Sequence, residues 1–555
     1  MSQVEEIILM PGQDEVQAAY LDSSHTGDIH GAWGTIKAND GATRQTWLKR
    51  LMTLLVIMGP GLITMVGDND AGGVQTYLQA GQQYGTSLLW TLLILIPVLV
   101  VNQEMVVRLG AVSGVGHARL IFERFGKLWG MFAVSDLFLL NFLTIVTEFI
   151  GFATALQYFG LSPYLSVPLG VLGLIAITLT GSFRRWESVM WVCCLTSLLM
   201  IPLAFIPHGS IGPVVTSTLL PSVRGGLNST ALLTIVAIIG TTVTPWQLFF
   251  QQSNVVDKRI SVRWLKNEQA DTIIGAFLTN IEAAGLIIGA AFAFAATKFD
   301  GAFTDVGTTA HQFGAVGHPI MGVLLMIVLL NASIIGACAV SLSTSYAFGD
   351  AFKTNQSLHR TFGEAKMFYC SYAALLTAAG SIVVLSPPQL LAILTLVVQA
   401  LAGTLLPGAT LILLLLCNDR DVLGPWVNKP WFNAIAVTIV GALITISVLL
   451  TVTTLLPLNN EQTLLLAVIL GAVLVVSLLA MGGCSLLRAR RYGPDTKLAA
   501  LYRTDKMAWR MPPFTELPRP AWSLTRKLGM FTLRAYLIIA VLLLAYKFIQ
   551  LAFPG

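Results

Sequence analysis

The sequence predicts an all-α, polytopic membrane protein: an inverted repeat of five plus five helices with broken first and sixth helices, followed by additional C-terminal helices. Three observations predict it. The 555-residue chain is 55% hydrophobic and 11% charged, with a mean hydropathy of +0.74, which is too apolar for a soluble globular protein. Apolar windows of about 20 residues recur along it. The first and sixth windows are interrupted at matching positions, as in transporters with a midplane binding site.

Thirteen windows are long and apolar enough to cross a bilayer. They lie near 50–84, 86–108, 128–158, 163–181, 189–207, 230–253, 271–296, 319–347, 366–386, 389–417, 432–457, 463–487 and 532–552. The expected organisation is a cytoplasmic N-terminal tail (1–46), a ten-helix transporter core (47–417), two additional transmembrane helices (418–487), a basic cytoplasmic linker (488–530) and a final transmembrane helix (531–555). The tail lacks the short apolar core of a signal peptide.

Lysine and arginine are distributed unequally between the two sets of connecting loops. One set holds most of the basic residues, and the other offers little beyond Arg224 and Lys298. By the positive-inside rule, the N-terminus is cytoplasmic, and we expect an integral protein of the plasma (inner) membrane. The net charge of +5 is then a topology signal, and we expect no nucleic-acid partner. The basic linker could also bind anionic lipid, although topology and solubility explain it more simply.

The first interruption lies in the stretch Gly59–Tyr84, which reads GPGLITMVGDNDAGGVQTYLQAGQQY. Its apolar first half meets Gly67, Asp68, Asn69 and Asp70 before the pattern becomes helical again. Free carbonyls and a carboxylate at that depth are tolerated only where they line a cavity or hold an ion. We therefore predict a cation site with Asp70 as ligand. The alternative is that Asp70 only caps the next helix; Asp68 could line the mouth of the site or be a polar loop residue.

The second interruption lies in the sixth window, which reads IIGTTVTPWQ. Gly240 and Pro245 weaken the helix there, because proline lacks an amide hydrogen and collides with the preceding turn. Thr241 and Thr244 lie inside the break. Threonine in a membrane helix usually bonds back to a carbonyl one turn earlier, but this location favours a ligand role. The pairing of two breaks, one with an aspartate, favours a transporter over a structural kink.

At these residues the chain resembles the NRAMP family of divalent metal-ion transporters, which have the LeuT-type fold. The resemblance covers roughly 51–424 and rests on GPGLITMVGDNDAGG, LQAGQQYGTSLLW, VVRLG, IIGTTVTPWQL and LLPGATLILLLLCNDRDVLG. The family carries Asp-Pro-Gly-Asn in its first helix and Ala-Thr-Val-Met-Pro-His-Asn in its sixth. The resemblance implies that the aspartate ligand falls on Asp70, the asparagine on Gly73, the alanine carbonyl on Thr241 and the methionine thioether on Thr244.

The departures from the family pattern change the expected cation. Oxygen ligands suit magnesium, calcium or manganese, whereas a thioether favours softer metals. Thr244 therefore makes the site better suited to hard cations. Glycine at Gly73 removes one ligand and is expected to leave room for water. Mg²⁺ commonly keeps several waters and binds one or two carboxylates. The pattern is similar to the NRAMP-related magnesium transporter branch, although the residues alone would also admit Mn²⁺ or Ca²⁺.

Proton coupling is the second departure. The family's acidic pair in the third helix falls on Ile145 and Glu148, and its sixth-helix histidines fall on Trp246 and Gln251. All seven histidines lie outside the predicted spans or at their ends, so no imidazole is expected to relay protons at mid-membrane. We therefore predict uncoupled uptake, driven by the ion gradient and the membrane potential.

Further polar residues are expected in a second shell or along the ion pathway. Glu148 and Glu282 are intramembrane acids, which are costly unless they are functional or hydrogen-bonded; Glu282 could line a vestibule or be a buried hydrogen-bonded acid. Gln399 matches a tenth-helix glutamine of the family that faces the ion, with interhelical hydrogen bonding as the alternative. Trp246 and Gln247 follow the second break.

The predicted function is uncoupled uptake of partly hydrated Mg²⁺ by alternating access. The alternatives are a proton-coupled Mn²⁺/Fe²⁺ transporter and, from another class, a sodium-coupled organic solute symporter. We expect no enzyme activity, since the sequence has no HExxH and no phosphate-binding glycine loop followed by lysine. The expected partners are the divalent ion and the lipid bilayer, for a monomer without cofactors. The six cysteines lie in or beside apolar segments, so no disulfide framework is expected.

Overall fold

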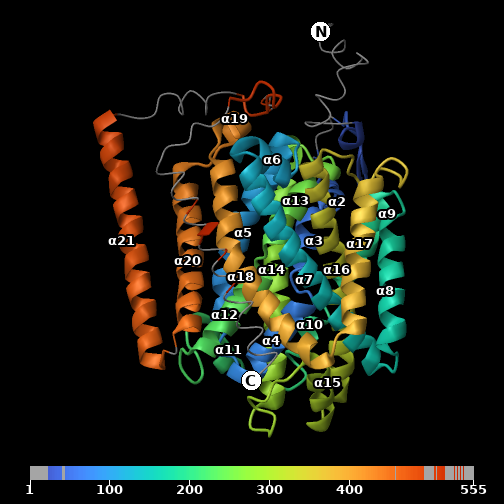
Figure 1. Cartoon of the computed structure of the whole chain (residues 1–555), viewed down its shortest axis with the longest axis vertical. Coiled ribbons are helices and arrows are strands. Elements are labelled where there is room, and N and C mark those ends of the chain that lie inside the picture. Colours follow the sequence, from blue (N-terminus) through green and yellow to red (C-terminus); the bar gives the residue numbers. More distant parts are fainter. Residues whose placement is uncertain are drawn as a thin grey trace.

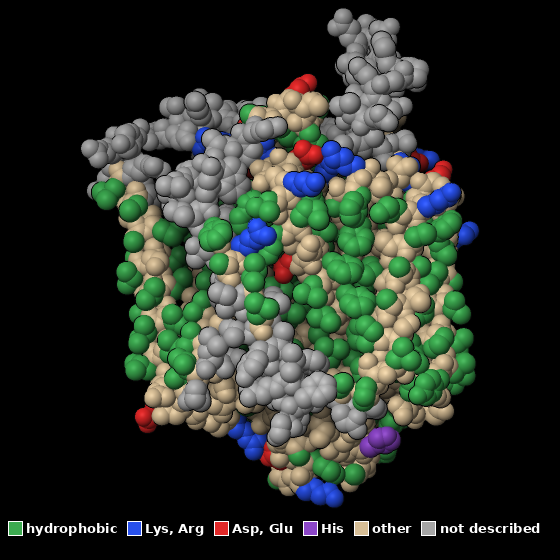
Figure 2. Space-filling view, in the orientation of Figure 1, with side chains coloured by type: hydrophobic (Ala, Val, Ile, Leu, Met, Phe, Trp, Pro, Cys, Tyr) green, Lys and Arg blue, Asp and Glu red, His purple; other side chains and the backbone are tan. Residues whose placement is uncertain are grey.

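The computed structural model describes residues 23–492, apart from 41–43, 45 and 457, together with 505–507, 509, 511–518 and a few positions between 531 and 542. Figure 1 shows a bundle of long, roughly parallel helices. We call the end at which α6 and α19 lie the N-terminal end, and the end at which α15 lies the far end. Hydrophobic side chains cover the sides of the bundle in Figure 2, as expected for a surface in contact with lipid.

The described chain begins with a short hairpin at the N-terminal end. After η2 (Ser23–His25), strands β1 (Ile29–Gly31) and β2 (Gly34–Ile36) pair antiparallel. The hairpin packs against α2 (Trp47–Ile57) and α9 (Phe183–Ser197), where the rings of Trp33 and Trp191 meet edge to face at 5.4 Å. The predicted tail thus contains an ordered segment close to the first helix.

The first predicted break is present at residues 67–70, and the span is also bent at Gly59, where the sequence analysis predicted no break. Helix α2 ends before Gly59, which adopts a φ of +153° that favours glycine. Helix α3 (Pro60–Val66) starts with a proline in its first turn, where a missing amide hydrogen costs nothing. The two are bent by 59°. The chain then unwinds before α4 (Ala71–Tyr84), so Asp68 and Asp70 lie between helices.

The second predicted break separates α12 (Ser229–Thr242) from α13 (Pro245–Asp257). Thr244 caps α13: its side chain and that of Gln247 bond reciprocally to each other's backbone amides. Between the two breaks lie α5 (Leu89–Ser113), α6 (His117–Phe125), α7 (Lys127–Tyr158), α8 (Pro163–Thr178), α9, α10 (Met200–Leu203) and α11 (Ile211–Leu219).

The remaining helices complete the core and begin the C-terminal addition. They are η3 (Val262–Trp264), α14 (Leu265–Phe294), α15 (Val306–Ala315), α16 (Pro319–Phe352), α17 (Lys366–Leu385), α18 (Pro388–Cys417), α19 (Arg420–Leu423), η4 (Gly424–Trp426), α20 (Pro430–Leu455) and α21 (Asn460–Tyr492).

Within the described residues, ten helices are long and apolar enough to cross a membrane, or eleven if the bent pair α2 and α3 counts as one span. The difference from thirteen has two main sources. The predicted span at 163–181 is a shorter apolar helix, α8, and the predicted span at 532–552 lies outside the residues described as a continuous chain. Helix α21 stands apart from the bundle in Figure 1, and its apolar window is not buried.

Candidate cation site

The two breaks meet in the interior of the bundle. The carboxylate Oδ1 of Asp68 accepts a hydrogen bond of 3.1 Å from the Thr244 hydroxyl. The backbone carbonyl of Asp68 accepts one of 3.3 Å from the Thr241 hydroxyl. Asp68, Thr241 and Thr244 are each at most 1% exposed. One acid and two threonines, taken from opposite halves of the predicted repeat, therefore form one contiguous oxygen-lined site.

Asp70 lies two residues further along the same break and is also buried. It is the N-cap of α4: its Oδ1 accepts a hydrogen bond of 2.6 Å from the amide of Gly73. The structure thus contains the helix cap weighed from the sequence. Glu148 of α7 bonds to the amide of the next residue, Ala71. Gln399 of α18 lies against Gly72, so Asp70 lies near both helices.

Several buried oxygens at this junction have no hydrogen-bond partner among the described residues. They are Asp68 Oδ2, Asn69 Oδ1 and Glu148 Oε1. Leaving a buried acceptor unsatisfied costs about 1–3 kcal/mol, and more when it carries charge. Unsatisfied carboxylate oxygens beside hydroxyl and carbonyl oxygens can bind a hard cation. No three His, Cys, Asp or Glu side chains converge as a metal cluster in the described part of the chain, so such a cation would need the hydroxyl, carbonyl and amide oxygens as well.

The expectation that Gly73 leaves open space needs correction. A β-carbon at this position would lie 2.8 Å from the Asp68 carbonyl oxygen and 2.8 Å from the Thr241 hydroxyl. The volume beside Gly73 is therefore already occupied by two oxygen groups. Glycine here permits close approach of the two breaks and brings those oxygens inward, instead of providing room for additional water.

Glu148 and Gln399 border the site from neighbouring helices. Glu148 is fully buried, and its Oε2 accepts a hydrogen bond of 3.2 Å from the amide of Ala71. The side-chain amide nitrogen of Gln399 lies 1.8 Å from the position that a β-carbon on Gly72 would take, so only glycine fits beside it. Both side chains reach the start of α4, and their role around an ion stays a prediction.

Glu282 is a buried, hydrogen-bonded acid and does not line the cavity that reaches the site. Its Oε2 accepts a hydrogen bond of 2.8 Å from Asn69, and its Oε1 accepts one of 2.6 Å from Ser197. It therefore supports the break through Asn69, a residue that sequence reasoning did not single out although it lies between the two aspartates.

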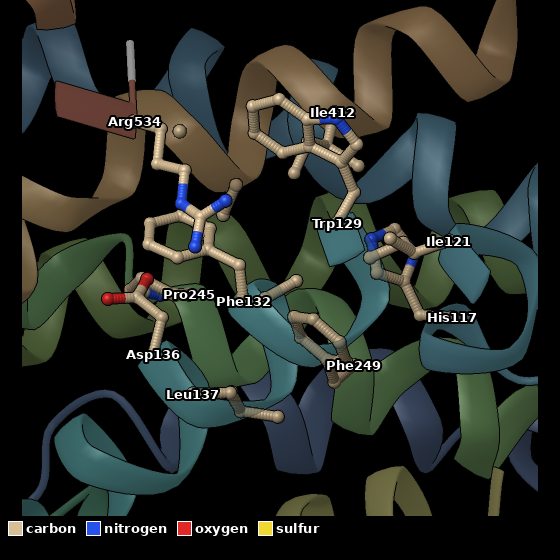
Figure 3. A pocket seen from close by; sticks show the side chains of 13 residues that line it. His117, Ile121, Trp129, Phe132, Asp136, Leu137, Pro245, Phe249, Ile412 and Arg534 are labelled. Carbon is tan, nitrogen blue, oxygen red and sulfur yellow. The ribbon is translucent and has the colours of Figure 1, made fainter. Parts of the chain in front are cut away.

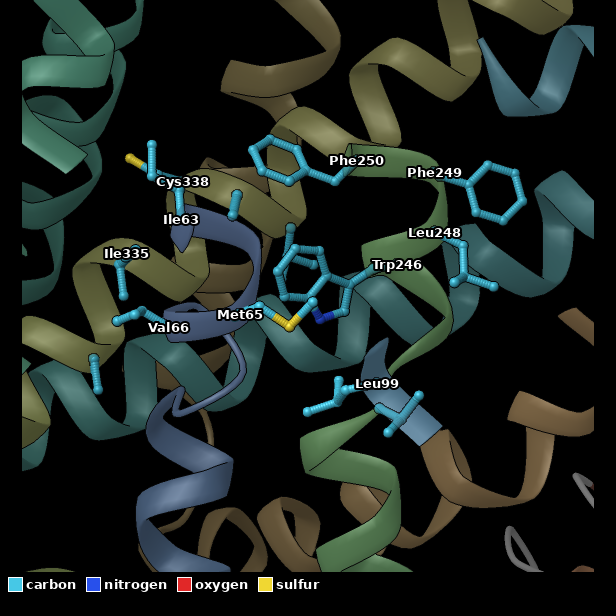
Figure 4. Packing of buried hydrophobic residues seen from close by; sticks show 14 of the residues in the cluster. Ile63, Met65, Val66, Leu99, Trp246, Leu248, Phe249, Phe250, Ile335 and Cys338 are labelled. Atoms are coloured by element: carbon cyan, nitrogen blue, oxygen red, sulfur yellow. The ribbon is translucent and has the colours of Figure 1, made fainter. Parts of the chain in front are cut away.

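Trp246 and Gln247 have structural roles beside the second break. The indole of Trp246 is fully buried and lies next to Met65 in Figure 4, closing the site with apolar surface. The Gln247 carbonyl accepts hydrogen bonds from Gln103 at 3.0 Å and from the Thr244 amide at 3.2 Å. These bonds fix the Gln247 side chain at the start of α13, where it holds the backbone of Thr244 in place.

A cavity of about 730 Å³ reaches this region from the far end. Its lining includes Ala71, next to Asp70, and Thr147, next to Glu148, together with His311 on α15 and Asp305, the N-cap of that helix. The cavity therefore extends from the far end to the residues beside Asp70 and Glu148, while the two acids themselves do not line it.

The N-terminal end is closed by a charged network that the sequence analysis missed. Asp271 accepts hydrogen bonds from the amides of Gly59, Gly61 and Leu62 at 3.0, 2.7 and 3.1 Å. Lys258 and Glu187, both without solvent exposure, form a salt bridge of 2.5 Å beside it. The sequence offered one sign of this network: acids lie at the ends of apolar windows, and an acid at such a position needs a partner.

A separate pocket contains a further intramembrane acid, Asp136, between α6, α7, α13 and α18. In Figure 3, Asp136, Phe132 and Arg534 lie on one side of it, opposite His117. The guanidinium of Arg534 lies 4.9 Å from the centre of the Phe132 ring. None of the predicted site residues lines this pocket.

Comparisons with known proteins agree with this architecture. The model of the family described as "Natural resistance-associated macrophage protein-like" (Nramp) matches residues 61–453. A similar sequence is the "Divalent metal cation transporter MntH" of Latilactobacillus sakei, 25% identical over 420 residues, which are 72% of this chain and 90% of that protein. The same description applies to a Staphylococcus aureus protein that is 26% identical over 428 residues, covering 72% and 91%.

The fold has solved counterparts. The crystal structure of an Eremococcus coleocola manganese transporter, in complex with an aromatic bis-isothiourea substituted compound, superposes with a TM-score of 0.62 at 18% identity, covering 81% of this chain and 97% of that one. The family model covers more than half of the chain and both breaks. The chain therefore belongs to the Nramp family of membrane transporters and is not an enzyme.

Proposed function

We propose that this protein transports divalent metal cations across the membrane by alternating access, and that its main substrate is partly hydrated Mg²⁺. The observation that carries the proposal is the free carboxylate oxygen of Asp68, buried where the hydroxyls of Thr241 and Thr244 meet the same residue. An unpaired buried carboxylate is costly unless a cation satisfies it. Asp70, two residues on, contributes a second acid.

The donor set supports a hard cation. Carboxylate, hydroxyl and carbonyl oxygens suit Mg²⁺, Ca²⁺ and Mn²⁺, and Thr244 supplies oxygen where the family's typical residue supplies sulfur. Mg²⁺ is usually held by one or two carboxylates and retains several waters, which fits two buried aspartates beside a cavity whose lining reaches Ala71. Mn²⁺ is the second candidate, because the relatives are described as divalent metal cation and manganese transporters.

We further propose that uptake is not coupled to protons. Ile145 is apolar and fully buried at one of the positions where the resemblance implies a proton acceptor, and the other, Glu148, is bonded to the amide of Ala71. With the N-terminus in the cytoplasm, the membrane potential itself drives cation entry. Each elementary charge crossing about 100 mV gains about 2.3 kcal/mol.

The alternating-access step is assigned to the first broken helix. The cavity open at the far end stops at Ala71, while Asp271 and Lys258 hold the backbone between α2 and α3 at the N-terminal end. Release of the ion towards the N-terminal end therefore requires α2 and α3 to move away from this network.

The test is a proteoliposome assay with a magnesium-sensitive dye and a pH dye in the same vesicles. Wild-type protein should admit Mg²⁺ without acidifying the lumen, and Asp68→Asn and Asp70→Asn should each abolish most uptake. Asp136→Asn is the matched control, an intramembrane acid outside the site, and should transport normally. Entry of Mn²⁺ but not Mg²⁺, accompanied by acidification, would reverse both the substrate and the coupling.

Selectivity is tested separately at Thr244. We expect Thr244→Met to shift competition towards Mn²⁺ or Cd²⁺, because a thioether replaces a hydroxyl that touches Asp68. Competition by Cd²⁺ that is unchanged from wild type would show that Thr244 does not face the transported ion.

A further inference from the structure

A second cavity, of about 420 Å³, lies at the N-terminal end between α5, α14 and α20, away from the cation site. It combines charged groups with aromatic side chains. The charged groups are Glu104, Arg108, Lys429 and Lys506, and the aromatic ones are Trp426, Trp431 and Phe432.

Two of the four charges satisfy each other. Arg108 donates to both carboxylate oxygens of Glu104, at 3.0 and 2.9 Å. Its remaining donors reach the Trp426 carbonyl at 2.5 Å and the Asn428 side chain at 2.6 Å. Glu104 also accepts from Gln269 at 3.0 Å. This pair holds the wall of the cavity and leaves little capacity for a ligand.

The two lysines are placed differently. Lys506 is anchored through its backbone, whose carbonyl accepts a hydrogen bond of 3.0 Å from the Trp426 indole, and its ammonium lies 5.1 Å from the centre of that ring. Burial, together with the positive charges of Lys429 and Arg108, lowers the pKa of Lys506 from its usual value. Among the described residues, neither lysine forms a salt bridge. Within the described part of the cavity, the two ammonium groups therefore add positive charge that no described carboxylate pairs with.

The flank of the cavity is apolar and open to the lipid-facing surface. Trp431 is 60% exposed and Ile273 is 42% exposed. Ile273 begins a stripe on α14 that continues, at four-residue spacing, through Phe277 and Ile281, which are 49% and 51% exposed. Tryptophan marks the membrane interface, and a stripe of exposed apolar side chains below it offers a track for an acyl chain. A free anion would need no such track.

We propose that this cavity binds an anionic phospholipid of the leaflet at the N-terminal end, with its phosphate held by Lys429 and Lys506 and its acyl chain along the α14 stripe. Basic pockets between transmembrane helices bind acidic headgroups in this way. Because Lys506 belongs to the basic linker after α21 and Lys429 precedes α20, the lipid would tie the linker to the transporter core. This assignment is independent of the cation that the protein carries.

Native mass spectrometry of the full chain, titrated with phosphatidylglycerol or phosphatidylcholine of identical acyl chains, tests the proposal. Each basic residue near an anionic headgroup contributes about 1 kcal/mol, so wild type should prefer the first phosphatidylglycerol about thirty-fold. Lys429→Gln/Lys506→Gln should remove most of that preference, and Lys429→Arg/Lys506→Arg should restore it. The control Lys127→Gln/Lys366→Gln removes the same charge from exposed sites elsewhere and should bind as wild type.

Three results would overturn the proposal. One is equal binding of the two lipids by wild type. Another is a preference that survives in the double glutamine variant, or that the double arginine variant fails to restore. The third is displacement of phosphatidylglycerol by millimolar inorganic phosphate, which would show that the lysines recognise a free anion. Thermal unfolding of each variant, measured alongside, should match wild type, because Lys429 is exposed and Lys506 is only half-buried.

Discussion

Replacing Lys258 with methionine should destabilise the protein strongly. The ammonium is fully buried and uses all three donors: it reaches the carbonyls of Ile57 and Met58 at 2.7 and 2.8 Å and Glu187 at 2.5 Å. Lys258→Met removes these bonds and leaves a buried carboxylate unpaired. Breaking a buried pair in this way costs about 3–5 kcal/mol, a large share of the roughly 5–15 kcal/mol that stabilises a typical protein.

The assay is thermal unfolding in detergent, followed by tryptophan fluorescence. Lys258→Met should unfold several degrees below wild type. Adding Glu187→Gln to the same protein should recover part of the loss, since the unpaired carboxylate is then neutral. Lys366→Met, a change at an exposed lysine of the same end, is the control and should be neutral. The reasoning fails if the single variant unfolds with wild type, or if the double variant is less stable than the single.

Two further predictions concern packing and pH. Gly73→Asn should cost about 1–3 kcal/mol of stability and lower Mg²⁺ uptake, because its β-carbon would collide with Asp68 and Thr241; wild-type uptake and unfolding would refute this. Burial lowers the pKa of His117 to about 4. Between pH 6.5 and 4, this imidazole is therefore protonated in the unfolded chain and neutral in the folded one. Stability should therefore fall by about 3 kcal/mol between pH 6.5 and 4 through this group alone, and His117→Gln should remove that part of the pH dependence, as measured by unfolding.

The sequence predicted the two breaks because their causes are local. Glycine, proline and aspartate inside apolar windows weaken a helix wherever it packs. Local sequence did not show which aspartate would meet the threonines. Thr244 contacts Asp68, whereas the Asp70 carboxylate caps α4. That outcome depends on how two unwound segments face each other, and the spacing of residues does not contain this information.

The residues that support the α2–α3 junction and the first break could not be predicted from the sequence either. Asp271 lies 210 residues from the Gly61 amide that it binds, so only the packing of α14 against α3 brings them together. An isolated acid at the start of an apolar window shows that some partner must exist, but not which one. The same holds for Glu282, whose partner Asn69 is 213 residues away.

The network around the junction of α2 and α3 explains how a membrane helix can be interrupted there. A carboxylate, Asp271, satisfies the free amides at the start of α3, and an ammonium, Lys258, satisfies the free carbonyls at the end of α2. Each orphan group of a helix end thus meets the charge that its dipole favours. Because water could replace these partners, but lipid could not, the junction can open only towards an aqueous space. Glu187 also accepts a hydrogen bond of 2.6 Å from Ala32 of the N-terminal hairpin, so the opening that we propose for transport would displace the hairpin as well.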